Sequence, residues 1–403
     1  MNYTKEEVMQ YVEEEDVKFV RMAFCDIFGR QRNIAVMSSD LDRAFEQGVA
    51  FDASAINGFD MEVRSDLFLR PNPQTLRELP WRPQHGRVAH MFCDIVYPDG
   101  RPFEGDTRRV LKEAVRFAAN RGLQFSFGTE MEFYLFKLDE NGSPTQIPFD
   151  QAGYMDVAPD DRGENVRREI CLTLDRMGIE PQNSHHESGP GQNEIDFRYA
   201  DPLSAADHAI IFRSAVKTIA ALNGLNADFS PRPLKHSPGN GMHINISARR
   251  GDQELGPQEL VPGLLEKILD MTLFLNPGDN SYERLGRDKA PGWVTWSEEN
   301  RSQLIRVPAA SGPYRRVELR SPDSLSNPYL DFALIIYASL YGLDHRLPLP
   351  EPADFNSFAA GAEKMKQYRK LPASLTEAAS YAWESRFIRD FIPELILRGY
   401  YNR

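Results

Sequence analysis

The chain has 403 residues, of which 41% are hydrophobic and 26% charged, a composition typical of a globular protein with two or three domains. Its formal net charge of -12 argues against nucleic acid or an anionic membrane as the main partner. Cys25, Cys93 and Cys171 form no CxxC pair, and the acidic N-terminus lacks the apolar segment of a signal peptide. We therefore expect reduced thiols, a cytoplasmic location and no membrane or nucleic-acid partner.

The first 103 residues predict a small, mostly β domain. Thr4 and Glu7 have the spacing of a capping box, which predicts a helix over residues 4–15. Two extended runs separated by Gly29 then predict a hairpin, and RVAHMFCDIVY predicts a later strand. The turn YPDGRPFEGD marks a boundary near Glu104, so we expect domains over residues 1–103 and 104–403.

Helices and strands are mixed in the second domain, which makes the chain an α+β protein. Apolar residues at helical spacing predict a helix over residues 107–121. The apolar run from Tyr329 to Leu343 carries Asp331 and is too short to span a membrane, so it predicts a buried helix. Ser374 and Glu377 form a second capping box, which predicts a helix through about residue 387.

Four predicted strands carry acidic or imidazole side chains on the face opposite their apolar residues. In FSFGTEMEFYLF, alternation places Glu130 and Glu132 together on the polar face. The same pattern recurs with Glu194 in NEIDFRY, His243 in MHINIS and Glu318 in RVELR. We expect these faces to be open to solvent. Any one of them is also compatible with an ordinary half-solvated antiparallel strand.

Two glycine-rich turns favour a metal site over that alternative. HHESGPGQNE places Glu187 before Glu194, and KHSPGNGMH leads into His243; glycine lets backbone approach a ligand closely. Glutamates gathered on one face repel each other unless a cation neutralises them. Oxygen ligands with one imidazole and no cysteine suit Mg²⁺ or Mn²⁺ rather than structural zinc. The predicted metal ligands are Glu130, Glu132, Glu187, Glu194, His243 and Glu318.

Arginines are concentrated in the region that follows. The group comprises Arg284, Arg301, Arg306, Arg315, Arg316 and Arg320. Next to a metal cluster, such a group suits a phosphoryl group undergoing transfer. The alternative is a network of surface salt bridges.

Taken together, these stretches resemble the glutamine synthetase family. The matching segments run in order from about residue 15 to 343 and include VKFVRMAFCDIFGRQRNIAV, FDASAINGF, FGTEMEFYLF, HHESGPGQNEIDF, RPLKHSPGNGMHINIS, NPGDNSYERL, NRSQLIRVP and RRVELRSPDSLSNPYLDFAL. The resemblance implies a small β-grasp domain and a larger catalytic domain, whose curved antiparallel sheet carries the metal site and is flanked by helices. It also implies a homo-oligomer of hexameric rings, a hexamer or dodecamer, with active sites between subunits.

The resemblance assigns roles to individual residues. The ion that orders the amino-acid substrate is expected at Glu132, Glu187 and Glu194. The ion that bridges the ATP phosphates is expected at Glu130, His243 and Glu318, so each site would hold two or more Mg²⁺ or Mn²⁺ ions. Substrate and the transferring phosphoryl group are expected to contact Arg284, Gly239, Arg301 and Arg320. The residues expected near ATP are Tyr199, Ser247, Arg306 and Arg316. Asp52 resembles an aspartate that reaches a neighbouring subunit's site and helps to bind ammonium.

Three positions depart from the family pattern. Lys289 stands before Ala290-Pro291, where the family has a flap glutamate that takes a proton from ammonium. Asp288 is the alternative base if the shorter loop shifts in register. Pro238 displaces an asparagine that contacts the substrate, and Ala55 replaces a usual serine. The chain also lacks the Asn-Leu-Tyr segment that is adenylylated in some bacterial members, so we expect no such regulation.

The implied activity is ATP-dependent ligation of glutamate and ammonia to glutamine. The glutamate side chain attacks the γ-phosphate of ATP, and an amine then displaces phosphate from the acyl phosphate. The departures leave three alternatives open. One is a ligase for a polyamine or alkylamine. The second is a related protein without ligase activity, and the third is a kinase that stops at a stable phosphorylated product.

Overall fold

A computed structural model describes residues 3–60, 63–82, 85–310 and 315–403. Its N-terminal part contains a six-stranded sheet in the order β2-β1-β6-β4-β3, with β5 paired to β6. The predicted hairpin is formed by β1 and β2, and β1 runs parallel to β6. The strands are β1 Val17–Cys25, β2 Gln31–Met37, β3 Val49–Asp52, β4 Asp66–Pro71, β5 Arg77–Glu78 and β6 Arg87–Val96. This is the expected small β-grasp unit.

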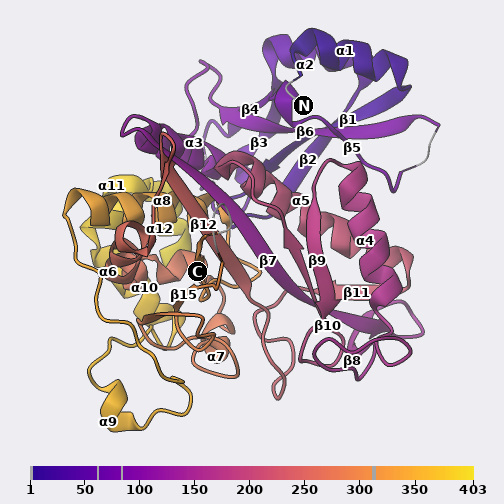
Figure 1. Cartoon of the computed structure of the whole chain (residues 1–403). Coiled ribbons are helices and arrows are strands. Elements are labelled where there is room, and N and C mark those ends of the chain that lie inside the picture. Colours follow the sequence, from indigo (N-terminus) through magenta and orange to yellow (C-terminus); the bar gives the residue numbers. More distant parts are fainter. Residues whose placement is uncertain (1–2, 61–62, 83–84, 311–314) are drawn as a thin grey trace.

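Helices α1 (Lys5–Glu14) and α2 (Leu41–Gln47) lie on the outer side of this sheet (Figure 1). The capping box predicted for the first helix is present. The Thr4 side chain accepts a hydrogen bond from the Glu7 N–H at 3.2 Å, and Glu7 accepts one from the Thr4 N–H at 2.7 Å. Val8 and Val12, one turn apart, bury the inner face of α1.

The second part is built on a ten-stranded sheet in the order β14-β15-β16-β12-β7-β10-β9, with β8 and β11 paired to β7 and β13 to β12. Only the β14–β15 pair is parallel among the pairs described. Strand β7 crosses the whole of this part (Figure 1). The strands are β7 Leu123–Leu138, β8 Pro144–Pro148, β9 Pro181–His186, β10 Gln192–Phe197, β11 Leu225–Asp228, β12 Met242–Arg250, β13 Gln253–Glu254, β14 Trp296–Glu298, β15 Ile305–Val307 and β16 Val317–Leu319.

Helices flank this sheet, as expected. The predicted helices over residues 107–121 and 329–343 are present as α3 and α8, and α8 is almost wholly buried. The helix predicted to reach residue 387 ends instead at Glu384. Ser385 adopts an extended conformation and caps a new helix by accepting a hydrogen bond from the Ile388 N–H. The helices are α3 Thr107–Ala119, α4 Glu164–Arg176, α5 Pro202–Leu222, α6 Pro257–Leu275, α7 Ser281–Arg284, α8 Pro328–Asp344, α9 Ala362–Met365, α10 Leu375–Glu384, α11 Arg386–Phe391 and α12 Glu394–Tyr401.

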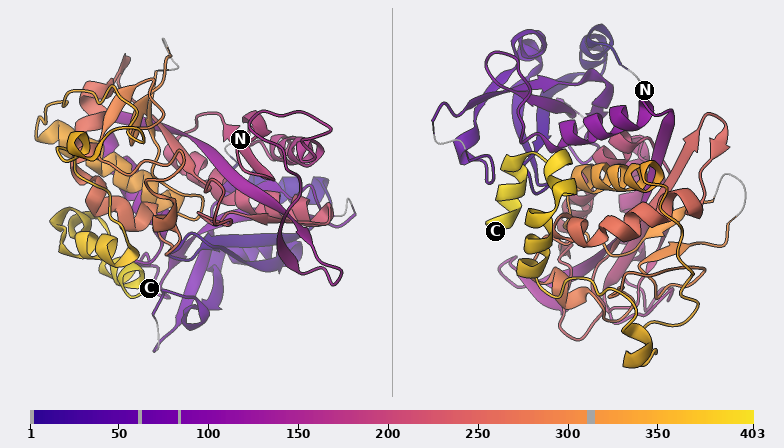
Figure 2. Two further views of the ribbon diagram at one scale, coloured as in Figure 1. Left: turned by 90° about the horizontal axis from the view of Figure 1, so that it is seen from below. Right: turned by 90° about the vertical axis from the view of Figure 1, so that its left-hand side faces the viewer.

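The C-terminal helices return to the N-terminal unit (Figure 2). The Tyr400 hydroxyl on α12 and the Asn327 side chain before α8 both donate hydrogen bonds to the carbonyl oxygen of Ile27, each at 3.0 Å. Segments remote in sequence therefore fix the position of the small sheet beside the large one. Within the described ranges, no helix combines the length and apolarity needed to cross a membrane.

Candidate active site

A cavity of about 820 Å³ opens on the polar face of the large sheet. Its walls come from β7, β9, β10 and β12, from the turn before β12, and from the loop after α7. Most of the residues that the sequence singles out line it, namely Glu130, Glu132, Glu187, Glu194, Gly239, His243, Arg284, Arg301, Arg306, Arg316 and Arg320. The cavity is therefore strongly charged, with acidic and basic groups facing each other.

Strand register brings the acidic residues together. On β7, Glu130 pairs with His243 of β12 on one side and with Asp196 of β10 on the other. Glu132 pairs with Glu194 in the same way. Directly opposed residues on adjacent strands lie within side-chain contact distance. Three strands thus build one charged surface, as the strand alternation predicts.

The first ligand group combines Glu130, His243 and Glu318, whose ligand atoms lie within 4.8 Å of one another. His243 Nδ1 lies 3.2 Å from Glu130 Oε2 and 3.8 Å from Glu318 Oε1. Burial acts to raise the pKa of Glu130, but hydrogen bonds from His243 and Asn245 outweigh it and lower this pKa to about 2. Glu130 is therefore ionised at neutral pH. These three residues match one of the two predicted metal sites.

Glu318 is fully buried, so the expectation that its strand face is open to solvent is wrong. Arg306 on the neighbouring strand contacts Glu318 Oε2 at 2.5 Å, and Arg320 pairs with the other carboxylate oxygen. The two arginines cover the strand and replace water around the carboxylate. A buried carboxylate with two charge-assisted partners is held in a fixed position.

The second ligand group combines His185, Glu187 and Glu194. His185 Nε2 lies 3.6 Å from Glu194 Oε1, and His185 Nδ1 lies 3.9 Å from Glu187 Oε1. Glu132, predicted for this site, stands opposite Glu194 on β7, where it accepts a hydrogen bond from the Gly241 N–H at 2.8 Å. The sequence prediction missed His185. Its position two residues before Glu187, in the pair His185-His186, could have indicated it as a further metal ligand.

The electrostatics of this second group favour a bound cation. Burial raises the pKa of Glu194 well above its ordinary value, and repulsion from Glu132 and Asp196 raises it further. Burial and the charge of Glu130 likewise raise the pKa of Asp196 to about 6. A divalent ion would remove this repulsion, and oxygen ligands with imidazole suit Mg²⁺ or Mn²⁺. The donor set therefore fits the predicted metal ions.

A pH-dependent stability follows for the metal-free protein. Because the pKa of Asp196 is raised from 3.8 to about 6, the folded state holds its proton more tightly than the unfolded state does. Its contribution to stability should be greatest below pH of about 4 and be lost as pH rises through about 6. Urea unfolding at several pH values in this range should show a free energy of unfolding that falls as the pH rises. Asp196→Asn should flatten this pH dependence, and an equal slope in that variant would refute the assignment.

A third acidic group, Asp150, Asp161 and His186, is structural. His186 Nε2 lies 2.9 Å from Asp150 Oδ1, which also accepts a hydrogen bond from the Gly191 N–H at 3.0 Å. Arg167 contacts both carboxylate oxygens of Asp161. These bonds hold the loop between β9 and β10, which carries Glu187.

Glycines allow the backbone to pass close to Arg284. A side-chain carbon on Gly239 would lie 2.2 Å from the Pro231 carbonyl oxygen and about 3.0 Å from Arg284 itself. Arg284 is 3% exposed, and its guanidinium donates to the Ser321 carbonyl oxygen at 2.7 Å. Asn240 turns inward and donates to backbone carbonyls, so it does not replace the asparagine displaced by Pro238.

The residues predicted near ATP divide between two cavities. Arg306 and Arg316 line the main one, and Arg316 Nε donates to Asn245 Oδ1 at 2.9 Å. Tyr199 and Ser247 line an adjacent cavity of about 600 Å³, together with Arg315. Tyr199 follows the end of β10 and is 37% exposed.

Asp52 lies at the end of β3 in the N-terminal unit and does not line the main cavity of its own chain. It is exposed, and its carboxylate accepts hydrogen bonds from the Ser54 hydroxyl at 2.6 Å and the Ser54 N–H at 3.0 Å. Hydrogen bonds from Ser54 and Ser65 lower the pKa of Asp52. Its role at a neighbouring subunit's site stays a prediction.

Comparison with known proteins gives the relationship. A family model described as "Glutamine synthetase, beta-Grasp domain" matches residues 16–98, and "Glutamine synthetase, catalytic domain" matches residues 104–403. The chain belongs to the glutamine synthetase family. It is therefore a ligase of this type, as the sequence resemblance predicts.

Relatives in this family cover almost the whole chain. A glutamine synthetase of Clostridium saccharobutylicum is 42% identical over 99% of this chain and 93% of its own length. One of Methanosarcina mazei is also 42% identical, over 98% and 92%. The solved complex of GmaS with ADP is 27% identical and superposes with a TM-score of 0.88, covering 100% of this chain and 94% of that one. Plasmodium falciparum glutamine synthetase, at 22% identity, shares the fold with a TM-score of 0.86 over 99% and 95%.

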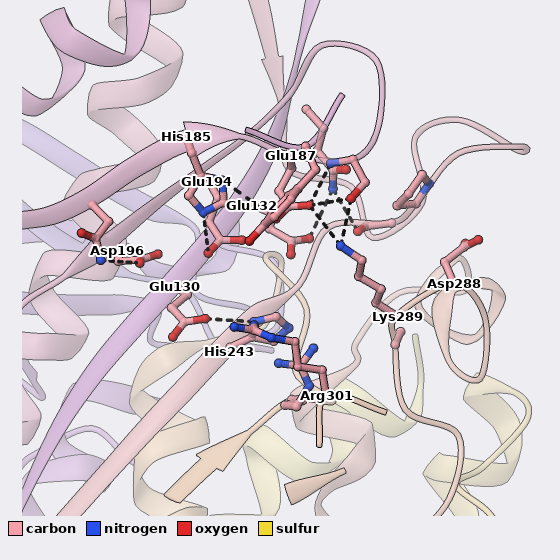
Figure 3. A pocket seen from close by; sticks show the side chains of 18 of the residues that line it. Glu130, Glu132, His185, Glu187, Glu194, Asp196, His243, Asp288, Lys289 and Arg301 are labelled. Carbon is pink, nitrogen blue, oxygen red and sulfur yellow. Dashed lines mark hydrogen bonds and ion pairs between the residues drawn. The ribbon is translucent and has the colours of Figure 1, made fainter. Parts of the chain in front are cut away.

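The loop between α7 and β14 carries the departure from the family at Lys289. Lys289 Nζ donates to Ser188 Oγ at 2.9 Å and lies 4.0 Å from Glu187 Oε2. Asp288 has a positive φ of 55° and pairs with Arg232 at 3.2 Å, so it points away from the glutamates (Figure 3). This conformation does not support Asp288 as the substitute base.

Proposed function

We propose that this protein is an ATP-dependent ligase that forms glutamine from glutamate and ammonia through a γ-glutamyl phosphate. The observation that carries the proposal is its 42% identity, over nearly its full length, with proteins named glutamine synthetase. The cavity adds support, because it combines buried carboxylates and an imidazole with several arginines. Phosphoryl transfer needs both kinds of group to position and neutralise the phosphate oxygens.

The chain's own residues have distinct roles in this proposal. Mg²⁺ or Mn²⁺ ions, two or more, would be held by Glu130, Glu132, Glu187, Glu194, His243 and Glu318. When bound, these ions neutralise charge on the phosphate oxygens and the carboxylates. Arg284 would bind the glutamate, beside the backbone at Gly239. Arg301 and Arg320 would stabilise the charge of the phosphoryl group while it moves from ATP to the glutamate side chain.

The nucleotide would extend from the main cavity into the adjacent one. Arg306 and Arg316 line the first and Tyr199 and Ser247 the second. Tyr199 packs beside Gly128 of β7, where an added side-chain carbon would lie 3.4 Å from the Tyr199 ring. An exposed aromatic ring is suited to stacking on adenine. The complex of GmaS with ADP, which has the same fold, supports a nucleotide site in this chain.

The assembly proposed is a homo-oligomer of hexameric rings, a hexamer or a dodecamer, in the cytoplasm. Asp52 supports this proposal, since it lies outside the main cavity of its own chain and is exposed at the end of an N-terminal strand. In a ring it would complete the ammonium site of the adjacent subunit. Sedimentation velocity would measure the assembly, and a monomer with full activity would contradict it.

The activity has a direct test. With ATP, Mg²⁺, glutamate and ammonium, the protein should release phosphate and form glutamine in equal amounts. Omission of either Mg²⁺ or ammonium should abolish glutamine formation. Amide detection by mass spectrometry should accompany the phosphate assay, with Arg320→Met as the inactive control. If phosphate is released but none of the amines tested yields an amide, ligation is rejected, and a kinase or a relative without ligase activity is favoured.

A ligase that uses a larger amine is the second candidate, and Lys289 is the observation that favours it. Its positive charge lies 4.0 Å from Glu187, where the family pattern places an acidic residue that attracts ammonium. The same assay with methylamine, ethanolamine and putrescine distinguishes the two. A kcat/KM for one of these amines above that for ammonium would favour this candidate.

A further inference from the structure

The ammonium group of Lys289 lies in a corner of the main cavity. The residues that form this corner stand across the cavity from the loop that carries Lys289. It donates to the Ser188 hydroxyl at 2.9 Å, lies 4.0 Å from the Glu187 carboxylate and stands 4.6 Å from the centre of the Tyr154 ring. Figure 3 shows the Lys289 side chain extending toward the glutamates. A hydroxyl, a carboxylate and a ring face are partners that proteins use to hold organic ammonium ions. The corner therefore accepts a primary ammonium group, and the chain's own lysine fills it.

The contacts that hold Lys289 there are weak enough to be exchanged. Its side chain is 59% exposed, and exposed ion pairs and cation–π contacts hold a side chain only weakly because water competes for the charge. The loop behind it has a narrow neck, where the Gly286 N–H donates to the Pro291 carbonyl oxygen at 3.2 Å. A side-chain carbon on Gly292 would lie 2.8 Å from Gly286 Cα, and Gly286 has a positive φ of 75°, so both positions of the neck favour glycine. Beyond this neck the Lys289 ammonium group is held by its exposed contacts alone, so another cation can exchange with it there.

We propose that Lys289 competes with a cationic second substrate for this corner and thereby sets the preference of the enzyme among amines. The inference rests on the proposed ligase function. An ammonium or alkylammonium ion must displace Lys289 before it can contact Glu187, Ser188 and Tyr154. Its apparent affinity is reduced by the fraction of time for which the lysine fills the corner. Lys289 thus acts as an intramolecular competitor for the binding site of a cationic amine.

Replacement by methionine tests this competition, because it removes the charge and keeps most of the length of the side chain. In Lys289→Met the KM for ammonium or methylammonium should fall on the order of fivefold, the size of the weak contacts that the lysine gives up. The KM values for ATP and glutamate should stay unchanged. Lys289→Arg should keep the high amine KM. The matched control is Lys235→Met, since Lys235 is not among the residues that line the cavity. An unchanged or higher amine KM in Lys289→Met would overturn the proposal.

Hydrogen exchange gives a measurement that does not depend on turnover. With Mg²⁺ present, amides of residues 285–292 should exchange faster in Lys289→Met than in the unmodified protein. Methylammonium chloride, but not sodium chloride, should speed exchange of these amides in the unmodified protein, because it displaces Lys289, and should have no effect on the variant. Wild-type exchange in the variant, or no effect of methylammonium on the unmodified protein, would overturn the proposal. If no amine yields an amide, the proposed function fails, and the exchange result still decides whether Lys289 fills this corner.

Discussion

Glu318→Ala should remove ATP turnover and also destabilise the protein. Glu318 is fully buried and contacts Arg306, Arg320 and His243. Without its carboxylate, two arginines are left buried without their partner, which costs about 3–5 kcal/mol in the free energy of unfolding. Loss of a proposed metal ligand should lower kcat by at least about a hundredfold, the scale for one electrostatic group in a preorganised site. Phosphate release and urea unfolding measure the two effects separately.

Glu318→Gln separates the metal role from the structural one. The amide keeps the volume of the carboxylate and can still accept hydrogen bonds from an arginine, so the loss of stability should be smaller. The loss of turnover should remain, because the charge is gone. Glu298→Ala, an exposed glutamate on β14 of the same sheet, is the matched control and should leave both quantities unchanged. Near-normal turnover in Glu318→Gln would remove Glu318 from the metal site.

Gly239→Ala should disrupt the amino-acid pocket by a steric effect. The added carbon would lie 2.2 Å from the Pro231 carbonyl oxygen and within about 3.1 Å of the Arg284 side chain. The backbone must shift, and Arg284, held by the Ser321 carbonyl oxygen, must move with it or lose its contacts. Displacement of a positioning group by about 1 Å costs on the order of a hundredfold in rate. We expect a raised KM for glutamate and a lower kcat, with a stability loss of about 1–3 kcal/mol from overpacking.

The control for this variant is Gly361→Ala. A side-chain carbon at Gly361 meets nothing within 4 Å, and its φ is negative, so the substitution should leave activity unchanged. Steady-state kinetics with varied glutamate and fixed ATP would measure the effect, and thermal unfolding would show that both variants fold. An unchanged KM for glutamate in Gly239→Ala would show that the turn does not position the amino-acid site.

The sequence predicted correctly those helices and strands whose start or orientation depends on one or two nearby residues. Thr4 and Glu7 specified the start of α1, and alternation in FSFGTEMEFYLF placed Glu130 and Glu132 on one face of β7. The prediction failed where a single residue could act in two ways. The apolar periodicity around Ser385 predicts a position inside a helix. Its hydroxyl instead caps α11, and the preceding helix ends there.

Residue types and their spacing along the chain were enough to identify which side chains are chemically able to form the site. Alternation fixed their faces, glycine turns marked the close approaches, and the family resemblance assigned the roles. Which of these side chains meet depends on how the strands and loops pack in three dimensions. The register of β10, β7 and β12 joins residues more than sixty positions apart, and the pairing of β9 with β10 sets His185 opposite Glu194. The packing of Arg306 and Arg320 turned an apparently exposed Glu318 into a buried one. Contacts between distant segments depend on register and burial, and neither is encoded in the period of a single strand.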